Sequence, residues 1–419
     1  MKEKKPEIRF KGYKDSWVEK PFGEVFDTLS NNTLSRDKLN YDGGIIQDVH
    51  YGDVLIKFGE ILDADKEQLP YITDCSEVTG TFLRDGDVII ADTAEDETVG
   101  KCTELCNVGD KKILSGLHTI PCRPKEEFAS GFLGYSLNSD KYHHKLLPLM
   151  QGIKVTSISK SGFDETKILY PISLNEQRNI VNFLRSLTEK VEAEQEICKK
   201  LEIIKKAMIE KLFPKNGDGA PQIRFAGYKG AWNSVPLREI ADKVTAKNIG
   251  TKYLETFTNS AELGVISQTD FFEHEITKLE NIDGYYVVER DAFVYNPRIS
   301  ASAPVGPINR NKLKRTGVIS PLYTVFKTHD VDLQFLEWYF KSRAWHKFMY
   351  YNGDSGARAD RFSIKDDLFF EMPIAVPELA EQKKIGELME NIDRLLVLHQ
   401  NKVQMIINIK NTCTRKMFV

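Results

Sequence analysis

The chain has 419 residues, of which 41% are hydrophobic and 28% are charged, and its formal net charge at pH 7 is −3. This length predicts about two to three domains, and the composition is typical of globular proteins. The balanced charge excludes a uniformly basic nucleic-acid-binding protein. Any contact with DNA must therefore come from local patches, or be shared with a partner.

The same survey predicts a cytoplasmic protein. No stretch approaches the ~18 uncharged apolar residues that a membrane span requires. The N-terminal MKEKKPEIRF lacks the apolar core of a secretory signal. Six scattered cysteines without such a signal indicate free thiols in a reducing compartment.

The first feature in chain order is a segment that occurs twice. It reads EIRFKGYKDSWVEKPFGEV at 7–25 and QIRFAGYKGAWNSVPLREI at 222–240. Later matches keep a spacing of 205 residues: LSGLHTIPCRP corresponds to ISPLYTVFKTH, and SLNEQRNIVNFL corresponds to ELAEQKKIGELM. This period is far longer than the ~20–50 residues of a solenoid repeat. It indicates tandem duplication of a globular body with an appendage.

The two bodies, 1–172 and 223–376, are predicted to mix strands with helices. Short β-branched and aromatic runs at 88–90 and 323–326 favour strands, whereas 333–350 favours a helix. The expected fold class is therefore α+β, with two mixed bodies in tandem repeat.

Each body precedes a predicted long helix, at 173–213 and at 377–419, and the linker 214–222 follows the first helix. Apolar residues recur at intervals of mostly three and four: Ile180, Leu184, Leu187, Val191, Ile197, Leu201, Ile204, Met208 and Leu212, then Ile385, Leu388, Ile392, Leu395, Val403, Ile406, Ile409, Cys413 and Met417. Such a narrow stripe is typical of a coiled-coil seam, so we expect the helices to bury their stripes against each other, antiparallel. About 38 residues at ~1.5 Å each would form a rod of about 55 Å, the length of about 16 base pairs.

Polar residues mark the starts and middles of these helices. Glu176-Gln177 and Glu381-Gln382 lie at the starts, where we expect helix capping and contacts with a partner or within the coiled coil; Ser173 completes the spacing of a capping box. Glu194 and His399 interrupt the stripes at equivalent positions. Because the midpoints of equal antiparallel helices meet, we expect these two side chains to face each other and fix the register. The alternative is that Ile197 or Leu398 fills the seam.

The order of body, Glu-Gln helix start and long helix, repeated twice, resembles the specificity subunit of a type I restriction–modification enzyme. The I-R-F-x-G-Y segments, GLHTIPCRP and PLYTVF carry this resemblance, which covers essentially the whole chain. It implies two target-recognition domains, each reading one half of a bipartite, asymmetric double-stranded DNA target, and helices that set the gap. It also implies two modification (methyltransferase) subunits and two restriction subunits. S-adenosylmethionine, ATP and Mg would belong to those partners, and this chain would be non-catalytic without a cofactor.

Local basic patches supply the candidate DNA contacts. Residues 289–315 carry six basic residues against two acidic ones, and basic residues and serines recur near the ends of both bodies, whereas 93–98 (TAEDET) is acidic. Arginine suits bidentate recognition of guanine, and lysine or serine can bind phosphate. The candidates are Lys154, Ser157, Lys160, Arg298, Arg310, Lys312, Arg358 and Arg361.

Two other classes of function stay open at this point: a coiled-coil scaffold without a DNA role, and a stand-alone nuclease or methyltransferase. The sequence offers little for catalysis. It has no G-x-x-x-x-G-K-[ST] loop, and YNPR at 295–298 lacks the second proline and the aromatic residue of an adenine-methyltransferase motif.

A zinc site also has a possible set of ligands in Cys102, Cys106, His118 and Cys122. However, the second body has no cysteine opposite the first two, and His118 corresponds to Tyr323 in a predicted strand. We interpret these residues as ordinary thiols and a packed strand histidine, and we predict no metal site.

Overall fold

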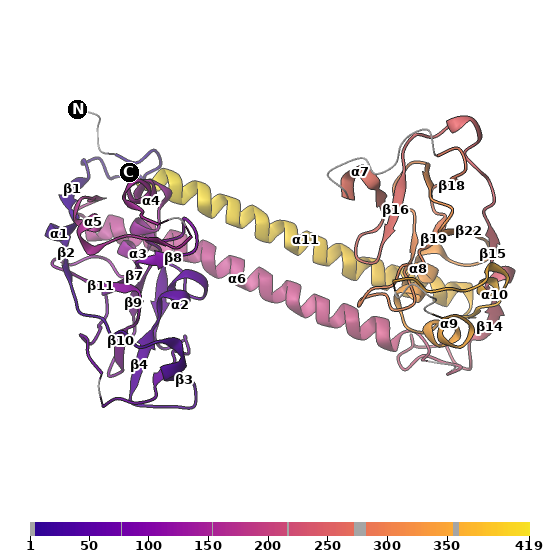
Figure 1. The fold of residues 1–419 in the computed structure, drawn as a ribbon, viewed down its shortest axis with the longest axis horizontal. Coiled ribbons are helices and arrows are strands. Elements are labelled where there is room, and N and C mark those ends of the chain that lie inside the picture. Colours follow the sequence, from indigo (N-terminus) through magenta and orange to yellow (C-terminus); the bar gives the residue numbers. More distant parts are fainter. Residues whose placement is uncertain (1–4, 77, 153, 216–217, 272–281, 355–359) are drawn as a thin grey trace. The chain divides into compact units, whose positions relative to one another are not determined.

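The computed structural model describes residues 5–76, 78–152, 154–215, 218–271, 282–354 and 360–419 (Figure 1). The chain forms two compact units, one made of residues 1–194 with 401–419 and the other of residues 195–400. Body 1 (1–172) belongs to the first unit and body 2 (223–376) to the second. Within the described ranges, no helix has the length and apolarity to cross a membrane.

Body 1 mixes short strands with short helices. Its strands are β1 Val18–Pro21, β2 Phe26–Thr28, β3 Leu39–Asn40, β4 Ile46–Val49, β5 Ile61–Asp63, β6 Tyr71–Ile72, β7 Val88–Ala91, β8 Thr93–Ala94, β9 Cys102–Cys106, β10 Lys112–Ser115, β11 Thr119–Pro124, β12 Thr156–Ser157 and β13 Lys167–Tyr170. Its helices are α1 Phe22–Val25, η1 Arg36–Lys38, α2 Tyr51–Ile56, α3 Phe132–Leu137, α4 Asp140–Leu146, η2 Leu147–Leu149 and α5 Lys160–Asp164. The main sheet has the order β2-β11-β7-β9-β5, and a second sheet has the order β10-β4-β6-β3.

Body 2 has the same kinds of element. Its strands are β14 Asn233–Pro236, β15 Ala241–Lys243, β16 Phe257–Ser260, β17 Gly264–Ser267, β18 Tyr286–Val288, β19 Phe293–Tyr295, β20 Ile308–Arg310, β21 Gly317–Ile319, β22 Thr324–Thr328 and β23 Pro373–Val376. Its helices are η3 Leu237–Glu239, η4 Ile249–Thr251, α7 Gln268–Phe271, α8 Leu333–Lys341, α9 His346–Asn352 and α10 Asp366–Phe370. The main sheet has the order β15-β22-β19-β20.

The two main sheets confirm the predicted duplication. The order β2-β11-β7-β9 in body 1 is the order β15-β22-β19-β20 in body 2, and β7 and β19 each run antiparallel to both neighbours. Every residue of β7 and β19 is buried, because these apolar runs pack on both faces of their sheets. The predicted α+β class is therefore correct.

One predicted helix in body 2 is in fact two. The stretch predicted at 333–350 divides into α8 and α9 at Ser342, whose backbone is extended. The Ser342 hydroxyl donates to the Tyr339 carbonyl at 2.6 Å, and the Trp345 indole donates to the Phe340 carbonyl at 3.0 Å. These side-chain bonds to the last carbonyls of α8 stabilise a sharp corner that a periodic apolar pattern does not reveal.

The two long helices are α6 (Leu174–Lys211) and α11 (Leu379–Met417), and they are antiparallel within each unit. In the first unit, Leu184 near the start of α6 shares a core with Met417 at the end of α11. In the second unit, Ile385 near the start of α11 shares a core with Leu212, which follows the end of α6.

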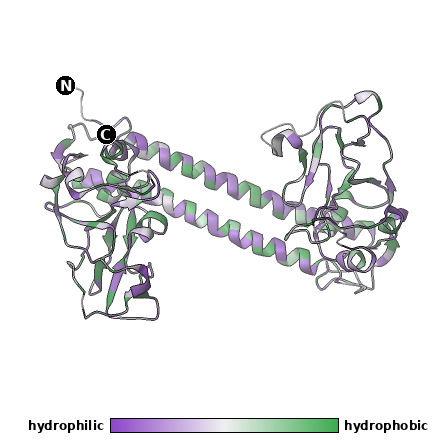
Figure 2. Ribbon diagram, in the orientation of Figure 1, coloured by the Kyte–Doolittle hydropathy of each residue, from purple (hydrophilic) through white to green (hydrophobic). Residues whose placement is uncertain are grey.

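The predicted packing of the two long helices is correct, and along it the apolar stripes are only partly buried. Ile197 and Ile204 of α6 are 37% and 43% exposed, and Leu395 and Ile409 of α11 are 45% and 39% exposed. Figure 2 shows hydrophobic and hydrophilic residues alternating along both helices. The stripe residues that enter the body cores are buried, whereas two helices alone leave part of each stripe uncovered.

The predicted pairing of Glu194 with His399 stays a prediction. Glu194 is 8% exposed, and within the first unit its carboxylate lies 2.5 Å from the Lys402 ammonium.

Candidate nucleic-acid interface

A duplicated clamp joins each body to the start of the following long helix. Arg9 makes a bidentate ion pair with Glu176, with its Nε at 2.6 Å and its Nη2 at 2.8 Å from the carboxylate oxygens. Arg224 pairs with Glu381 in the same way, at 2.7 and 2.8 Å. The arginine of each I-R-F segment thus binds the glutamate of each Glu-Gln pair, which explains why both motifs occur twice.

The glutamines complete the clamp with identical bonds. The Gln177 side-chain oxygen accepts from the Ala129 backbone amide, and its nitrogen donates to the Pro171 carbonyl, each at 2.8 Å. Gln382 accepts from Asp332 at 2.9 Å and donates to Pro377 at 2.8 Å. Each glutamine therefore ties a helix start to two loops of its own body.

These contacts correct two expectations for the helix starts. Ser173 does cap α6, because its hydroxyl accepts from the Glu176 amide at 3.3 Å. In a capping box the Glu176 carboxylate would also accept from the Ser173 backbone amide. Here it binds Arg9 and the Trp17 indole instead. All four residues predicted to contact a partner, Glu176, Gln177, Glu381 and Gln382, are buried and bonded within their bodies. Their side chains are not available to a partner.

The helix ends fix the other side of each body. The Ile8 amide donates to the Lys416 carbonyl at 3.0 Å, and the Ile223 amide donates to the Lys211 carbonyl at 3.0 Å. Beside these bonds, Phe418 packs against Trp17 in body 1, and Phe213 packs against Trp232 in body 2. Each body core is therefore closed by the aromatic residue that follows the end of one long helix and by the start of the other.

The structure brings several candidate DNA contacts to equivalent places in the two bodies. In body 1, β8 and β12 pair so that Thr93 lies opposite Ser157. In body 2, an antiparallel bridge places Arg298 opposite Arg361. Ser157 and Arg298 are exposed and Arg361 is partly exposed, so their side chains can reach a ligand. Lys154 and Lys160 are exposed near Ser157, whereas Arg358 lies outside the described residues.

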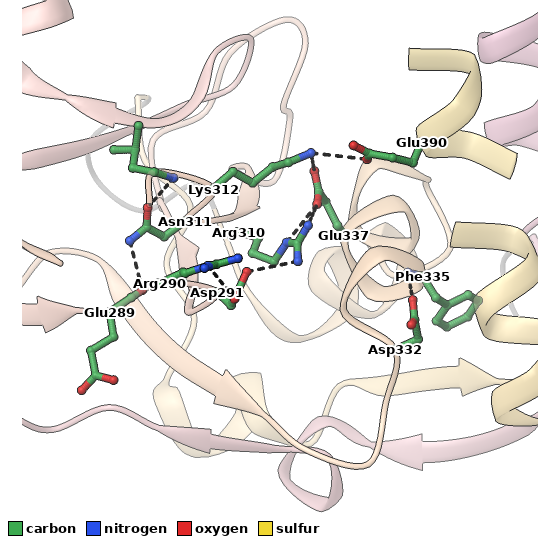
Figure 3. Close-up of polar contacts among 11 residues, drawn as sticks. Glu289, Arg290, Asp291, Arg310, Asn311, Lys312, Asp332, Phe335, Glu337 and Glu390 are labelled. Atoms are coloured by element: carbon green, nitrogen blue, oxygen red, sulfur yellow. Dashed lines mark hydrogen bonds and ion pairs between the residues drawn. The ribbon is translucent and has the colours of Figure 1, made fainter. Parts of the chain in front are cut away.

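The basic run at 289–315 is largely an internal ion-pair network (Figure 3). The Arg310 side chain is only 10% exposed and binds Glu337 at 2.9 Å and Asp291 at 3.2 Å. Lys312 reaches both Glu337 at 3.3 Å and Glu390 at 3.5 Å. These contacts tie β20 to α8 and α11. They correct the prediction for Arg310, whose guanidinium neutralises a buried carboxylate instead of facing DNA. The Lys312 ammonium belongs to the same network, but its side chain remains partly exposed.

Each body also contains a cavity beside the end of a long helix. The cavity of body 2 is about 820 Å³ and is lined by cationic and aromatic residues that include Lys205, Arg343 and Trp345. The cavity of body 1 is about 830 Å³ and is lined by Glu97 of the acidic TAEDET segment, among others. Lys410 lines it too and binds Glu60 at 2.8 Å. Lys205 and Lys410 stand 205 positions apart, so the two cavities lie at equivalent places, and both are lined by basic and acidic side chains.

The possible zinc ligands do not come together. Cys102 and Cys122 are buried thiols, and burial raises the pKa of Cys106 to about 11. Among the residues that the structure describes, no cluster of three or more His, Cys, Asp or Glu side chains could hold a metal. His118 is not a packed strand residue as predicted. It lies in the turn before β11 with φ of 57°, and its ring is half-exposed within 3.4 Å of the Thr93 hydroxyl.

One surface of body 2 was not predicted from the sequence. Arg343, Lys347, Tyr350 and Tyr351 are all exposed around α9. Their segment, RAWHKFMYY, interleaves basic and aromatic residues, which is the composition of many nucleic-acid contacts. This interleaved pattern is visible in the sequence. However, a continuous helix was predicted at 333–350, and that prediction does not show which of these residues face solvent.

No protein-family model matches the chain. Solved structures, however, are similar over nearly its whole length. The S subunit of a type I restriction–modification system from M. genitalium is 14% identical, with 99% of each chain covered and a TM-score of 0.57. The HsdS subunit from Thermoanaerobacter tengcongensis is 17% identical, with 97% of this chain and 98% of that chain covered and a TM-score of 0.51.

A third similar chain comes from work on complex assembly and conformational transition of the type I R-M system. It is 18% identical, covers 97% of this chain and 99% of its own length, and has a TM-score of 0.53. The class defined by these comparisons is a duplicated α+β protein with two long helices. In particular, this chain has the fold of type I restriction–modification S subunits.

Proposed function

We propose that this chain is the non-catalytic specificity subunit of a type I restriction–modification complex. Body 1 reads one half of a bipartite DNA target, body 2 reads the other half, and the long helices set the gap between the halves. The observation that carries this proposal is the full-length duplication: both bodies have the same sheet order and the same Arg–Glu–Gln clamp on a long helix. A protein with two diverged readers suits an asymmetric target with two separated parts.

The proposed partners are two modification subunits and two restriction subunits. S-adenosylmethionine, ATP and Mg would be bound by those partners. The uncovered apolar residues of the helices support docking of partner helices there: Ile203, Leu398 and Met405 are 68%, 59% and 59% exposed. Exposed apolar residues at helical spacing favour packing against a further helix.

The test is to produce the chain together with the modification subunit of its own genome and map the methylated DNA positions. The expected result is a bipartite asymmetric site with a fixed gap. Replacing residues 223–376 with body 2 of a relative should change one half of the site and leave the other half and the gap unchanged. If both halves changed together, the division of labour would be wrong.

The same preparation separates the other classes of function. A complex that assembles but selects no DNA sequence would indicate a scaffold. Methylation or cleavage by the purified chain alone, with S-adenosylmethionine or a divalent metal, would indicate an enzyme.

A further inference from the structure

The surface around α9 carries two exposed tyrosines next to an exposed lysine. One side of this helix is anchored by Met349 and by Trp345, which are both buried. On the other side, Tyr350 and Tyr351 are 56% and 78% exposed. Lys347 precedes them by about one turn, so the three side chains project from neighbouring positions of the helix surface.

A groove of about 580 Å³ runs along this surface. It is lined by Pro304, Arg343, His346, Lys347, Tyr350 and Tyr351, and the lining includes no carboxylate among the described residues. Burial, and secondarily Arg343, lower the pKa of His346 to about 4, so its imidazole is neutral at physiological pH. The positive charge of the groove therefore comes from Arg343 and Lys347. We call these two residues with Tyr350 and Tyr351 the α9 face.

The α9 face is chemically suited to a sugar–phosphate polyanion. Guanidinium and ammonium groups bind phosphate through charge-assisted hydrogen bonds. Exposed tyrosines offer ring faces to the sugars and a hydroxyl to the phosphates of the DNA backbone. The Lys347 ammonium lies 5.9 Å from the centre of the Tyr351 ring, so charge and ring act at the same place.

The α9 face is continuous with the candidate interface of body 2. The Tyr350 ring meets the Phe362 ring edge-on, with centroids 6.2 Å apart. Phe362 follows Arg361, which is bridged to Arg298. A strand of DNA that reaches the two bridged arginines would therefore find the α9 face beside them.

Body 1 has no such face at the equivalent helix. The corner before α4 in body 1 and the corner before α9 in body 2 can be aligned at Ser139 and Ser342. Each of these serine hydroxyls donates to the carbonyl three residues earlier at 2.6 Å. With that alignment, the four residues of the α9 face correspond to Asp140, His144, Leu147 and Pro148. An acid replaces an arginine, and the two tyrosines are lost.

The overall charge of the bodies differs in the same direction. Body 1 has 22 basic and 29 acidic residues, whereas body 2 has 20 basic and 19 acidic residues. Counterion release from DNA scales with the number of phosphates that a protein neutralises. Body 2 is therefore better suited than body 1 to hold the DNA backbone.

We propose that the α9 face is a sequence-independent clamp for the phosphate backbone of duplex DNA, and that only body 2 carries it. This inference rests on the proposed function. It adds that the two bodies contribute unequally to DNA binding. Body 2 supplies much of the affinity for DNA and of its salt dependence, whereas body 1 selects its half-site and binds the DNA backbone more weakly.

The test uses the complete complex with its modification subunits, on target duplex and on scrambled duplex, from 50 to 200 mM salt. The variant R343Q/K347Q should lower the slope of log affinity against log salt by about two. The loss should be the same on both duplexes, and the methylated sequence should not change. The matched control K229Q/K252Q removes two exposed lysine charges elsewhere in body 2 and should leave the slope unchanged.

The tyrosines are tested separately. Y350A/Y351A should weaken binding to both duplexes several-fold, and Y350F/Y351F should restore most of that loss because the rings remain. Unaltered thermal unfolding and complex assembly would show that each variant folds.

The outcomes separate this inference from the proposed function. If the wild-type complex selects its target but R343Q/K347Q behaves like the control, the clamp is wrong and the proposed function stands. A wild-type complex without target selection would overturn the proposed function itself. If R343Q/K347Q altered the methylated sequence, the face would read bases; if it prevented assembly, the occupant would be an acidic protein segment. Either result would overturn the clamp.

Discussion

Body 1 and body 2 each connect a strand of the main sheet to a helix through a buried carboxylate, but the carboxylate comes from opposite sides of the connection. In body 1, Glu104 of β9 accepts hydrogen bonds from the Gly131 and Gly134 amides at α3, at 2.6 and 3.0 Å. In body 2, Arg310 of β20 binds the Glu337 carboxylate of α8. The first joint places the carboxylate on the strand, and the second places it on the helix.

The comparison shows which parts of the duplicated unit tolerate divergence. The sheet order and the Arg–Glu–Gln clamp are the same in both bodies, because they position the body on its helices. Buried polar joints differ as long as each polar group finds a partner. Exposed surfaces such as α4 and α9 differ most, since little packing constrains them. Two copies of one scaffold can therefore carry different exposed surfaces, as the proposed reading of two different half-sites requires.

The largest expected effect comes from breaking the shared clamp. E176A should destabilise the first unit by about 3–5 kcal/mol, because it leaves the largely buried Arg9 without its carboxylate. E381A should do the same to the second unit by removing the partner of Arg224. Hydrogen exchange measured in each unit checks both effects. The control is K20A, which breaks an exposed ion pair with Glu126 and should change protection little because solvent screens such a pair. If one variant reduced protection from hydrogen exchange equally in both units, its effect would not be confined to the unit whose clamp it breaks.

The next effect is a pH dependence expected for body 1 only. Burial raises the pKa of Glu104 to about 7, and this outweighs the hydrogen bonds from the α3 amides, which lower it. The folded state therefore favours the protonated carboxyl. Its contribution is complete below the unfolded pKa near 4.5 and is lost as the pH rises toward 7, at up to ~1.4 kcal/mol per pH unit.

Denaturant unfolding of wild type and E104Q from pH 4.5 to 7 checks this sign. The wild type should lose stability across that range relative to E104Q. Body 2 should show no equivalent slope, because Arg310 lies opposite Phe293 where Glu104 lies opposite Val88, so no carboxyl group occupies that strand position. A wild-type curve parallel to that of E104Q would refute the raised pKa.

A smaller effect separates two arginines that the sequence grouped together. R310M should destabilise body 2 by about 1–3 kcal/mol and leave the salt dependence of DNA binding unchanged, because Arg310 binds Glu337 internally. R298Q should leave stability nearly unchanged and lower the salt slope by about one if it loses a phosphate contact. Chemical unfolding and binding titrations on the assembled complex measure both. The reverse assignment of effects would invalidate the proposed interface.

The smallest effect concerns the helix register. E194L/H399L should stabilise the helices by about 1 kcal/mol but permit slipped pairings, because a polar pair at a core position selects one register. Methylated sites with altered gaps between the half-sites would reveal the slip. A single unchanged gap in the variant would show that this pair does not set the register.

Much of the scaffold was determined by the sequence alone. The 205-residue spacing, the long helices and the α+β bodies follow from local patterns, because periodicity and repetition need no knowledge of distant contacts. The same patterns marked the I-R-F segments and the Glu-Gln pairs as repeated features. Only the fold showed that Arg9 binds Glu176 and Arg224 binds Glu381, since each pair is separated by more than 150 residues of chain.

The tertiary structure decided which charges are available at the surface. In sequence, Arg298 and Arg310 belong to one basic run. The fold leaves Arg298 exposed and buries Arg310 against Glu337, an acid from α8 that no local window includes. It also breaks the predicted helix at Ser342, which turns the α9 face outward. Local patterns set the elements, whereas desolvation and long-range pairing of charges determine which side chains remain free to bind a ligand.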